Sequence, residues 1–216
     1  MMELRMERVW LHIKSMREMF FVPLFGYFVL IPLGVWALSF EPEFYLSSSI
    51  SELCYLLVPF LSTWWIYLLL REYAEADGRE VLILGKGTLF SAAVFCLLNT
   101  MCVLPLLWVP VGYQYQNSIY YLVIEMMIVS FFMCGLVYFL VHFTKNITIS
   151  MFIIVLYCAL SNYTFAEEHF SKMLGPIQLS VLQDVPYEDG SNGYVKFILA
   201  GVMFWVFGVI YARRMQ

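Results

Sequence analysis

Charged residues are scarce in this sequence. Only 13% of its 216 residues are Asp, Glu, Lys or Arg, whereas a soluble domain contains about 25% of these residues. Hydrophobic residues make up 62% of the chain, and the mean hydropathy is +0.79. Because so few polar side chains cannot cover a surface that faces water, the composition predicts a protein whose surface mostly contacts lipid.

Sequence motifs for nucleotide binding and hydrolysis are also missing. "LGKGT" (84–88) contains Gly-Lys but lacks the G-x-x-x-x-G-K-[ST] spacing of a phosphate-binding loop, so no ATP site is expected on this chain. The apolar runs contain no Gly-x-Ser-x-Gly, Ser-Lys, paired-Asp or His-Glu-x-x-His arrangement, which argues against an intramembrane hydrolase.

Metal-binding patterns are not evident either. The five cysteines, at positions 54, 96, 102, 134 and 158, lie within apolar runs and lack metal-ligand spacing. We interpret them as small apolar packing residues. "EEH" (167–169) places adjacent side chains in different directions on a helix. We therefore assign no metal site.

Long apolar runs are the main positive feature of the sequence. Six of them approach the ~20 residues that a helix needs to cross ~30 Å of hydrocarbon. They cover residues 19–40, 53–70, 88–111, 118–143, 147–166 and 195–212. The runs lack the dyad alternation of a membrane barrel. The sequence thus predicts an all-α, polytopic membrane protein with six transmembrane helices in one transmembrane domain (1–216).

The basic residues predict how this domain is oriented. Ten of the twelve Lys and Arg residues fall in residues 1–18, the connections 71–87 and 144–146, and the tail. Only Lys172 and Lys196 fall on the other side. The positive-inside rule then places both termini and residues 71–87 in the cytoplasm.

The leader (1–18) has an amphipathic pattern. Apolar side chains recur at helical spacing at Met6, Val9, Trp10, Ile13, Met16 and Phe20, while Arg5, Arg8, His12 and Ser15 occupy another face. This pattern predicts a helix that lies along the inner membrane surface. An ordinary basic anchor for the first span is the alternative.

The longest outer connection is predicted at residues 164–194. Its "KMLGPIQLSVLQ" is partly apolar but too short to span a bilayer, so we expect a short helix at the outer interface. "DVPYEDGSNG", which follows, has the composition of turns.

The connection 71–87, "REYAEADGREVLILGKG", is unusually polar for this chain. It holds seven of the 28 charged residues and also contains the small apolar patch "VLIL". Glu72, Glu75 and Arg79 would share a helical face, and Gly78 permits a turn or a close backbone approach. We interpret the segment as a docking element for a soluble partner. The alternative is a solvated amphipathic link.

This layout resembles the type-2 permeases of ABC exporters. That family has an amphipathic leader, six spans and a first cytoplasmic loop that reads roughly E-x-x-G-x-x-E-x-L-L. The matching residues are Glu75, Gly78, Glu80, Leu82 and Leu84. The second acid falls one place early, and Arg79 stands where the family commonly has Thr or Ser. The chain length also resembles that of the compact permeases that export antimicrobial peptides or give immunity to them.

The resemblance implies a mechanism and partners. Two permease subunits, identical or paralogous, would pair in a bacterial plasma membrane, and ABC ATPase subunits that carry ATP and Mg would dock below them. The interface with the ATPase would comprise Glu72, Glu75, Asp77, Gly78, Arg79, Glu80, Leu82 and Leu84. No cofactor is expected on this chain, and no nucleic acid partner. An integral membrane scaffold or immunity protein without ATP coupling is the alternative function.

Three polar residues within the spans are candidates for a substrate path. Glu125 is the only acid deep within a span, and intramembrane acids are functional hypotheses by default. It would line a substrate path, accept hydrogen bonds from a neighbouring helix, or form a protonated structural contact. Asn99 and Asn162 are amides of the kind that usually hold helices together.

Overall fold

A computed structural model describes residues 2–38, 43–74, 88–105, 116–162 and 187–214 of the chain. Almost all of these residues are helical, and none of them forms a strand. The predicted all-α class is therefore confirmed for the part of the chain that the structure describes.

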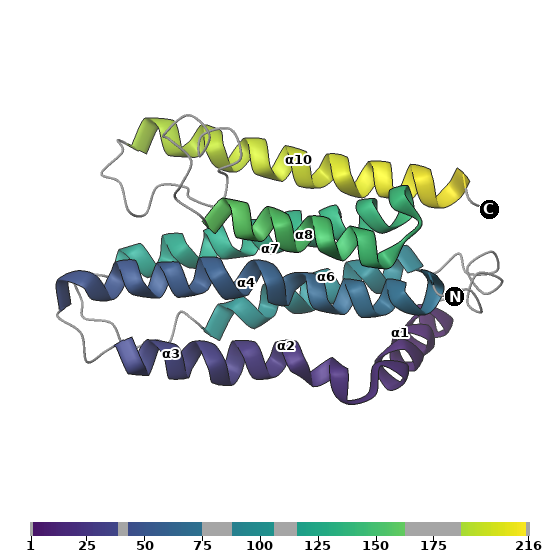
Figure 1. Cartoon of the computed structure of the whole chain (residues 1–216), viewed down its shortest axis with the longest axis horizontal. Helices are drawn as coiled ribbons and strands as arrows, with labels where there is room; N and C mark the ends of the chain where they lie inside the picture. The colour runs from purple at the N-terminus through teal and green to yellow at the C-terminus, as the bar shows by residue number, and fades with distance from the viewer. Residues whose placement is uncertain (1, 39–42, 75–87, 106–115, 163–186, 215–216) are drawn as a thin grey trace.

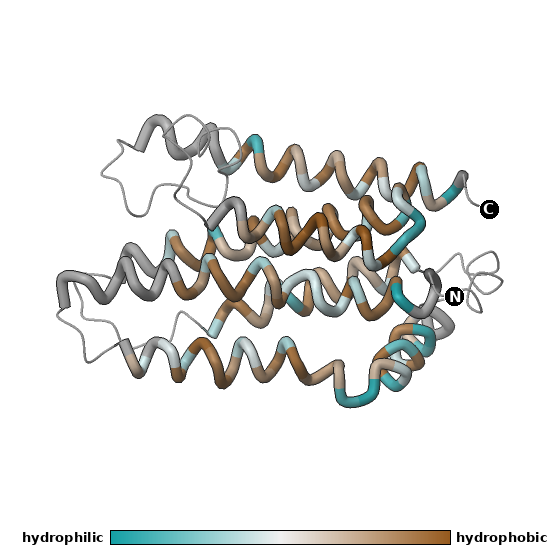
Figure 2. The backbone as a smooth tube through the Cα atoms, viewed as in Figure 1, coloured by the Kyte–Doolittle hydropathy of each residue, from teal (hydrophilic) through white to brown (hydrophobic). Residues whose placement is uncertain are grey.

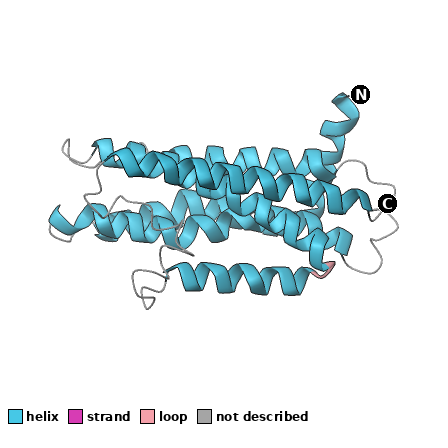
Figure 3. Cartoon of the chain, turned by 90° about the horizontal axis from the view of Figure 1, so that it is seen from above, coloured by secondary structure: helices cyan, strands magenta, loops and turns pink. Residues whose placement is uncertain are grey.

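The described helices pack side by side in an elongated bundle (Figure 1). Successive segments of the bundle run in alternating directions, and only α1 is tilted away from the common axis (Figures 1 and 3). The elements are α1 (Met2–Met16), η1 (Arg17–Phe20), α2 (Phe21–Phe25), η2 (Gly26–Leu30), α3 (Ile31–Leu38), α4 (Glu43–Ala74), α6 (Thr88–Val103), α7 (Gln116–Thr144), α8 (Ile147–Asn162) and α10 (Tyr187–Arg214).

Four of the described helical segments are long and apolar enough to cross a membrane. They are Met6–Gly34, Leu53–Arg71, Tyr120–Thr144 and Tyr194–Arg213. Two further apolar helices, Thr88–Val103 and Ile147–Ala159, are shorter. The structure thus supports a membrane-embedded helical protein, while the six complete spans stay a prediction.

Several helix bounds differ from those predicted. α4 begins at Glu43, within what was expected to be a connection, and α10 begins at Tyr187, so the turn expected over residues 184–193 is wrong from Tyr187 onward. Extending an existing helix costs far less than starting one. In α10, the acids Glu188 and Asp189 of the first turn also interact favourably with the positive end of the helix dipole.

The predicted span 88–111 is shorter as a regular helix than expected. α6 ends at Val103, and Leu104 and Pro105 have 3-10 helical backbone. Proline lacks the N–H that a helix needs and disfavours helical backbone at the residue before it. Residues 106–115 lie outside the described residues.

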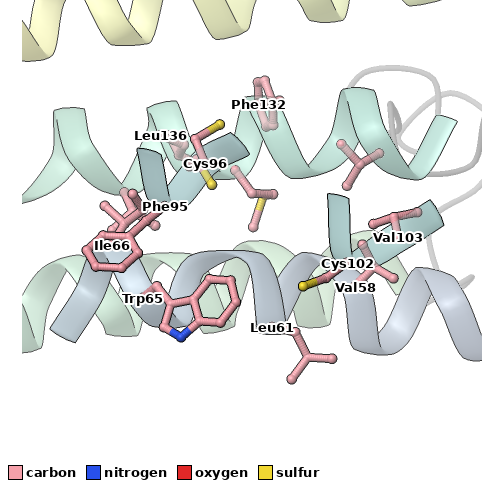
Figure 4. Close-up of a cluster of buried hydrophobic side chains, with 14 of the residues drawn as sticks. Val58, Leu61, Trp65, Ile66, Phe95, Cys96, Cys102, Val103, Phe132 and Leu136 are labelled. Carbon is pink, nitrogen blue, oxygen red and sulfur yellow. The ribbon is translucent and has the colours of Figure 1, made fainter. Parts of the chain in front are cut away.

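Helix α7 forms the centre of the bundle. In its most apolar stretch of 18 residues, 72% of the residues are buried. The corresponding share in α10 is 17%, although α10 packs along α7. The buried cluster around α7 includes Trp65 and Ile66 of α4, Phe95 of α6, and Phe132 of α7 (Figure 4). The exposed faces of α10 and of α2–α3 are apolar, as expected for surfaces that face lipid.

Small residues bring α7 and α10 close together. A Cβ atom added at Gly135 would lie 3.1 Å from the backbone oxygen of Gly201, and one added at Gly201 would lie 3.4 Å from the Cα atom of Phe132. Helices in lipid associate through such close packing rather than through the hydrophobic effect. Glycine at these positions therefore fixes the approach of α10 to the central helix.

The leader is an amphipathic helix, as its pattern predicted. Val9 and Met16 of α1 are buried against the bundle, whereas Met6 and Trp10 are exposed. The helix ends where Arg17 adopts the left-handed backbone conformation, with φ 49°. This residue turns the chain from the tilted α1 into the bundle (Figure 3).

All Lys and Arg residues of the described helices except Lys196 lie at one end of the bundle. α1, the last turn of α4, the α7–α8 turn and the last turn of α10 all lie there, and hydrophilic residues are concentrated at this end while the helix shafts are hydrophobic (Figure 2). These elements contribute Lys14, Arg71, Lys145 and Arg213. We call it the basic end; the predicted cytoplasmic side corresponds to it.

Candidate functional site

The predicted interface with an ATPase lies largely outside the described residues. Glu75, Asp77, Gly78, Arg79, Glu80, Leu82 and Leu84 all fall within 75–87, and the structure describes only the backbone of Glu72. The two helices that flank this segment are described. α4 ends at Ala74 and α6 begins at Thr88, both at the basic end (Figure 1).

Two tryptophans of α4 bind the residues that directly follow the leader. Trp65 Nε1 donates to the carbonyl oxygen of Phe20 at 2.8 Å, and Trp64 Nε1 donates to that of Met19 at 3.2 Å. The ring of Phe20 stacks on Trp65 with centroids 5.3 Å apart. The junction between α1 and the bundle is thereby attached to the helix that leads into residues 75–87.

Asn99 joins three helices in the core. Its Nδ2 donates to the backbone oxygen of Ser62 on α4 at 2.8 Å, and Cys134 Sγ of α7 donates to the same oxygen at 3.2 Å. Asn99 Nδ2 and Cys134 Sγ are 3.7 Å apart. Asn99, Ser62 and Cys134 are each fully buried. We call these three residues the amide cluster; it holds α4, α6 and α7 at one point.

The amide cluster includes Ser62, which lies three residues after the proline inside α4. Pro59 lies inside α4 and cannot donate the backbone hydrogen bond that other residues would make. The hydroxyls of Ser62 and Thr63 bond back to the carbonyl oxygens of Pro59 and Phe60, at 2.8 and 2.7 Å. Such bonds bend helices. Proline and back-bonded hydroxyls mark residues 59–63 as a point where α4 can flex.

A second pair of polar groups lies nearby. Tyr27 of η2 and Ser130 of α7 are buried, and their hydroxyls face each other without a hydrogen bond of standard geometry to a described residue. Cys54, Cys102 and Cys134 also lie around Tyr27. Polar groups from four segments thus converge inside an otherwise apolar bundle.

Glu125 is buried in the α4–α7 contact. Its side chain is 1% exposed, and neither carboxylate oxygen has a hydrogen bond of standard geometry to a described residue. The hydroxyl of Tyr55 on α4 faces the carboxylate, and Tyr194 of α10 lies within electrostatic range of Tyr55. Glu125 lies about 8 Å along α7 from Tyr120, at 1.5 Å per residue, in the half of the bundle opposite the basic end.

Asn99 and Glu125, two of the three candidate path residues, lie in different contacts of the bundle. Asn99 belongs to the amide cluster, whose Cys134 lies nine residues after Glu125 on α7, whereas Glu125 faces Tyr55. Asn162 is the last residue of α8, and its side chain is outside the described residues. His169 and the predicted interfacial helix fall within the undescribed residues 163–186.

Sequence reasoning missed the role of Cys134. It was predicted to be an apolar packing residue, yet its thiol donates to Ser62 and contacts Asn99. Asn99 and Cys134 lie in different spans, so no local pattern signals their contact. The five cysteines are all free thiols. Among the described residues, no group of three or more His, Cys, Asp or Glu is arranged to hold a metal ion.

Comparison of the chain with protein-family models, with curated proteins and with solved structures found no match.

Proposed function

We propose that this chain is the permease subunit of an ABC exporter, in which a separate ATPase chain supplies the energy for export of an amphipathic, peptide-like or lipid-like substrate. The observation that carries the proposal is the acidic, glycine-containing segment 71–84, which connects α4 and α6. Both flanking helix ends lie at the basic end, beside α1 (Figure 1). A polar segment here would be accessible to a soluble subunit.

The described contacts support a route for mechanical coupling. An ATPase that moved residues 71–84 would displace the ends of α4 and α6 together. The amide cluster bonds these helices to each other and to α7, next to the flexible point of α4. Force at the basic end would thus be transmitted to the centre of the bundle.

The leader fits the same mechanism. Val9 and Met16 of the leader pack against the bundle, whereas its apolar residues Met6 and Trp10 are exposed. In the proposed assembly all six apolar segments cross a bacterial plasma membrane, both termini are cytoplasmic, and α1 lies on the inner membrane surface. A second permease subunit, identical or paralogous, completes the substrate path.

Affinity purification from detergent-solubilised membranes of the native host tests this proposal. We expect an ATPase to co-purify with the tagged chain, and we expect Gly78→Arg or Glu75→Arg to reduce its yield at least tenfold. A bulky cation in a close interface clashes with the partner or leaves an unpaired charge there.

Glu18→Arg is the matched control, because it makes the same charge change at an exposed acid of the leader, and it should leave the ATPase bound. Two results together would support a membrane scaffold or immunity protein instead: the chain purifies without an ATPase, and both loop variants retain the wild-type biological activity.

A further inference from the structure

Among the described residues, the buried carboxylate of Glu125 has no basic partner. The described residues of α7 before His142 include no Lys, Arg or His, and Lys196 of α10 is exposed. An acid at this depth costs on the order of a few kcal/mol unless it finds a partner. The Tyr55 hydroxyl provides one polar neighbour for two carboxylate oxygens that otherwise lack described hydrogen-bond partners.

One tyrosine lies directly beside this acid, and two more lie in its vicinity. Tyr55 faces it from α4, and Tyr194 of α10 lies near Tyr55. Tyr121 is one helical turn from Glu125 toward the end opposite the basic end, and its side chain is 45% exposed. A tyrosine at the exposed surface thus lies on the same face of α7 as the buried carboxylate.

A carboxylate beside tyrosine rings is a recognition chemistry for organic cations. The carboxylate supplies charge and hydrogen-bond acceptors, and aromatic faces attract ammonium and guanidinium groups more strongly when water is excluded. Separation of α4 from α7 would expose Glu125 to such a group. The flexible point at residues 59–63 lies one to two turns along α4 from Tyr55 and would permit this movement.

We propose that Glu125, with Tyr55 and Tyr194, binds the positively charged group of an amphipathic substrate, so that the exported molecules are cationic. This substrate class rests on the proposed export function, but binding by the isolated chain does not require an ATPase.

The test uses two fluorescent amphipathic peptides of 18 residues that differ only in having Lys or Gln on the polar face. Each is titrated against the chain in nanodiscs of zwitterionic phosphatidylcholine, and empty nanodiscs are subtracted. We expect the wild-type chain to bind the Lys peptide at least tenfold more tightly than the Gln peptide. Glu125→Gln should abolish this preference, and Tyr55→Phe should reduce it.

Glu18→Gln removes an exposed carboxylate from the leader and should preserve the preference. Glu125→Asp retains the charge and should keep part of it. Equal binding of the two peptides by the wild-type chain, or a preference that survives Glu125→Gln, would overturn the proposal and show Glu125 to be a structural contact. If the affinity purification described above yields no ATPase while the preference for the Lys peptide holds, the cation site is retained and the exporter is rejected.

Discussion

Replacing Asn99 with Asp is expected to destabilise the bundle by about 3 kcal/mol or more, because the change removes a donor and adds a charge in a dry interior. The Nδ2 group donates to the Ser62 oxygen at 2.8 Å. An aspartate would present an acceptor to that oxygen instead, and like partial charges would repel. The free energy of unfolding in mixed micelles of increasing denaturing-detergent fraction measures the effect.

Asn99→Leu is the matched control for this change. It introduces an apolar side chain of similar size, and Cys134 still donates to the Ser62 oxygen. Because hydrogen bonds between membrane helices average about 0.6 kcal/mol, the loss should be near 1 kcal/mol. Equal stability of Asn99→Asp and wild type would show that water reaches the amide cluster. A loss for Asn99→Leu as large as that for Asn99→Asp would assign the cost to packing instead.

Replacing Glu125 with Leu should have the opposite effect on stability. The substitution removes a buried acid that lacks hydrogen bonds of standard geometry to described residues, and exchanging a buried charged group for a packed apolar one is often neutral or stabilising. We expect the free energy of unfolding to rise by about 1–2 kcal/mol, while transport of a cationic substrate falls at least tenfold. The same detergent titration and a vesicle transport assay measure the two quantities.

Tyr55→Phe combined with Glu125→Leu should be at least as stable as Glu125→Leu alone, because the double variant also removes the hydroxyl that faces the acid. Residues that reduce stability while supporting activity are typical of functional sites. A large destabilisation in Glu125→Leu would instead show that the carboxyl group holds α4 to α7.

The helical membrane class was predictable from sequence because it depends on composition and run length. Apolar runs of 18 residues or more appear directly as the helices around Leu53–Arg71 and Tyr120–Thr144. The tight α7–α8 connection was predictable as well. Asn146 Oδ1 accepts hydrogen bonds from the backbone N–H groups of Thr148 and Ile149, and Lys145 has a left-handed φ of 54°.

Helix ends were less predictable, because they depend on how far a helix continues into polar sequence. The turn-like residues Asp189 and Gly190 are helical in α10, where they extend an apolar helix already formed. The hydrogen-bonded contacts were the least predictable. Asn99 and Cys134 meet only because α6 and α7 pack together, and that packing depends on side chains far apart in sequence.

Glu125 shows both the strength and the limit of sequence reasoning. Its presence in an apolar run marked it as a candidate, and the structure places it in a buried contact. Its neighbour Tyr55 comes from α4, however, and Tyr194 near Tyr55 comes from α10, so nothing in the local pattern pairs them with it. Sequence could therefore name the acid but not its surroundings.

Site-specific photocross-linking in native membranes tests most directly whether residues 71–87 contact an ATPase and respond to ATP hydrolysis. A photoreactive amino acid at Asp77 should cross-link to an ATPase subunit, and the yield should change when ATP hydrolysis is blocked with vanadate. The same amino acid at the exposed Tyr120, opposite the basic end, should give no such product. An active protein whose position 77 reacts only with lipid or with its own chain would contradict the exporter account.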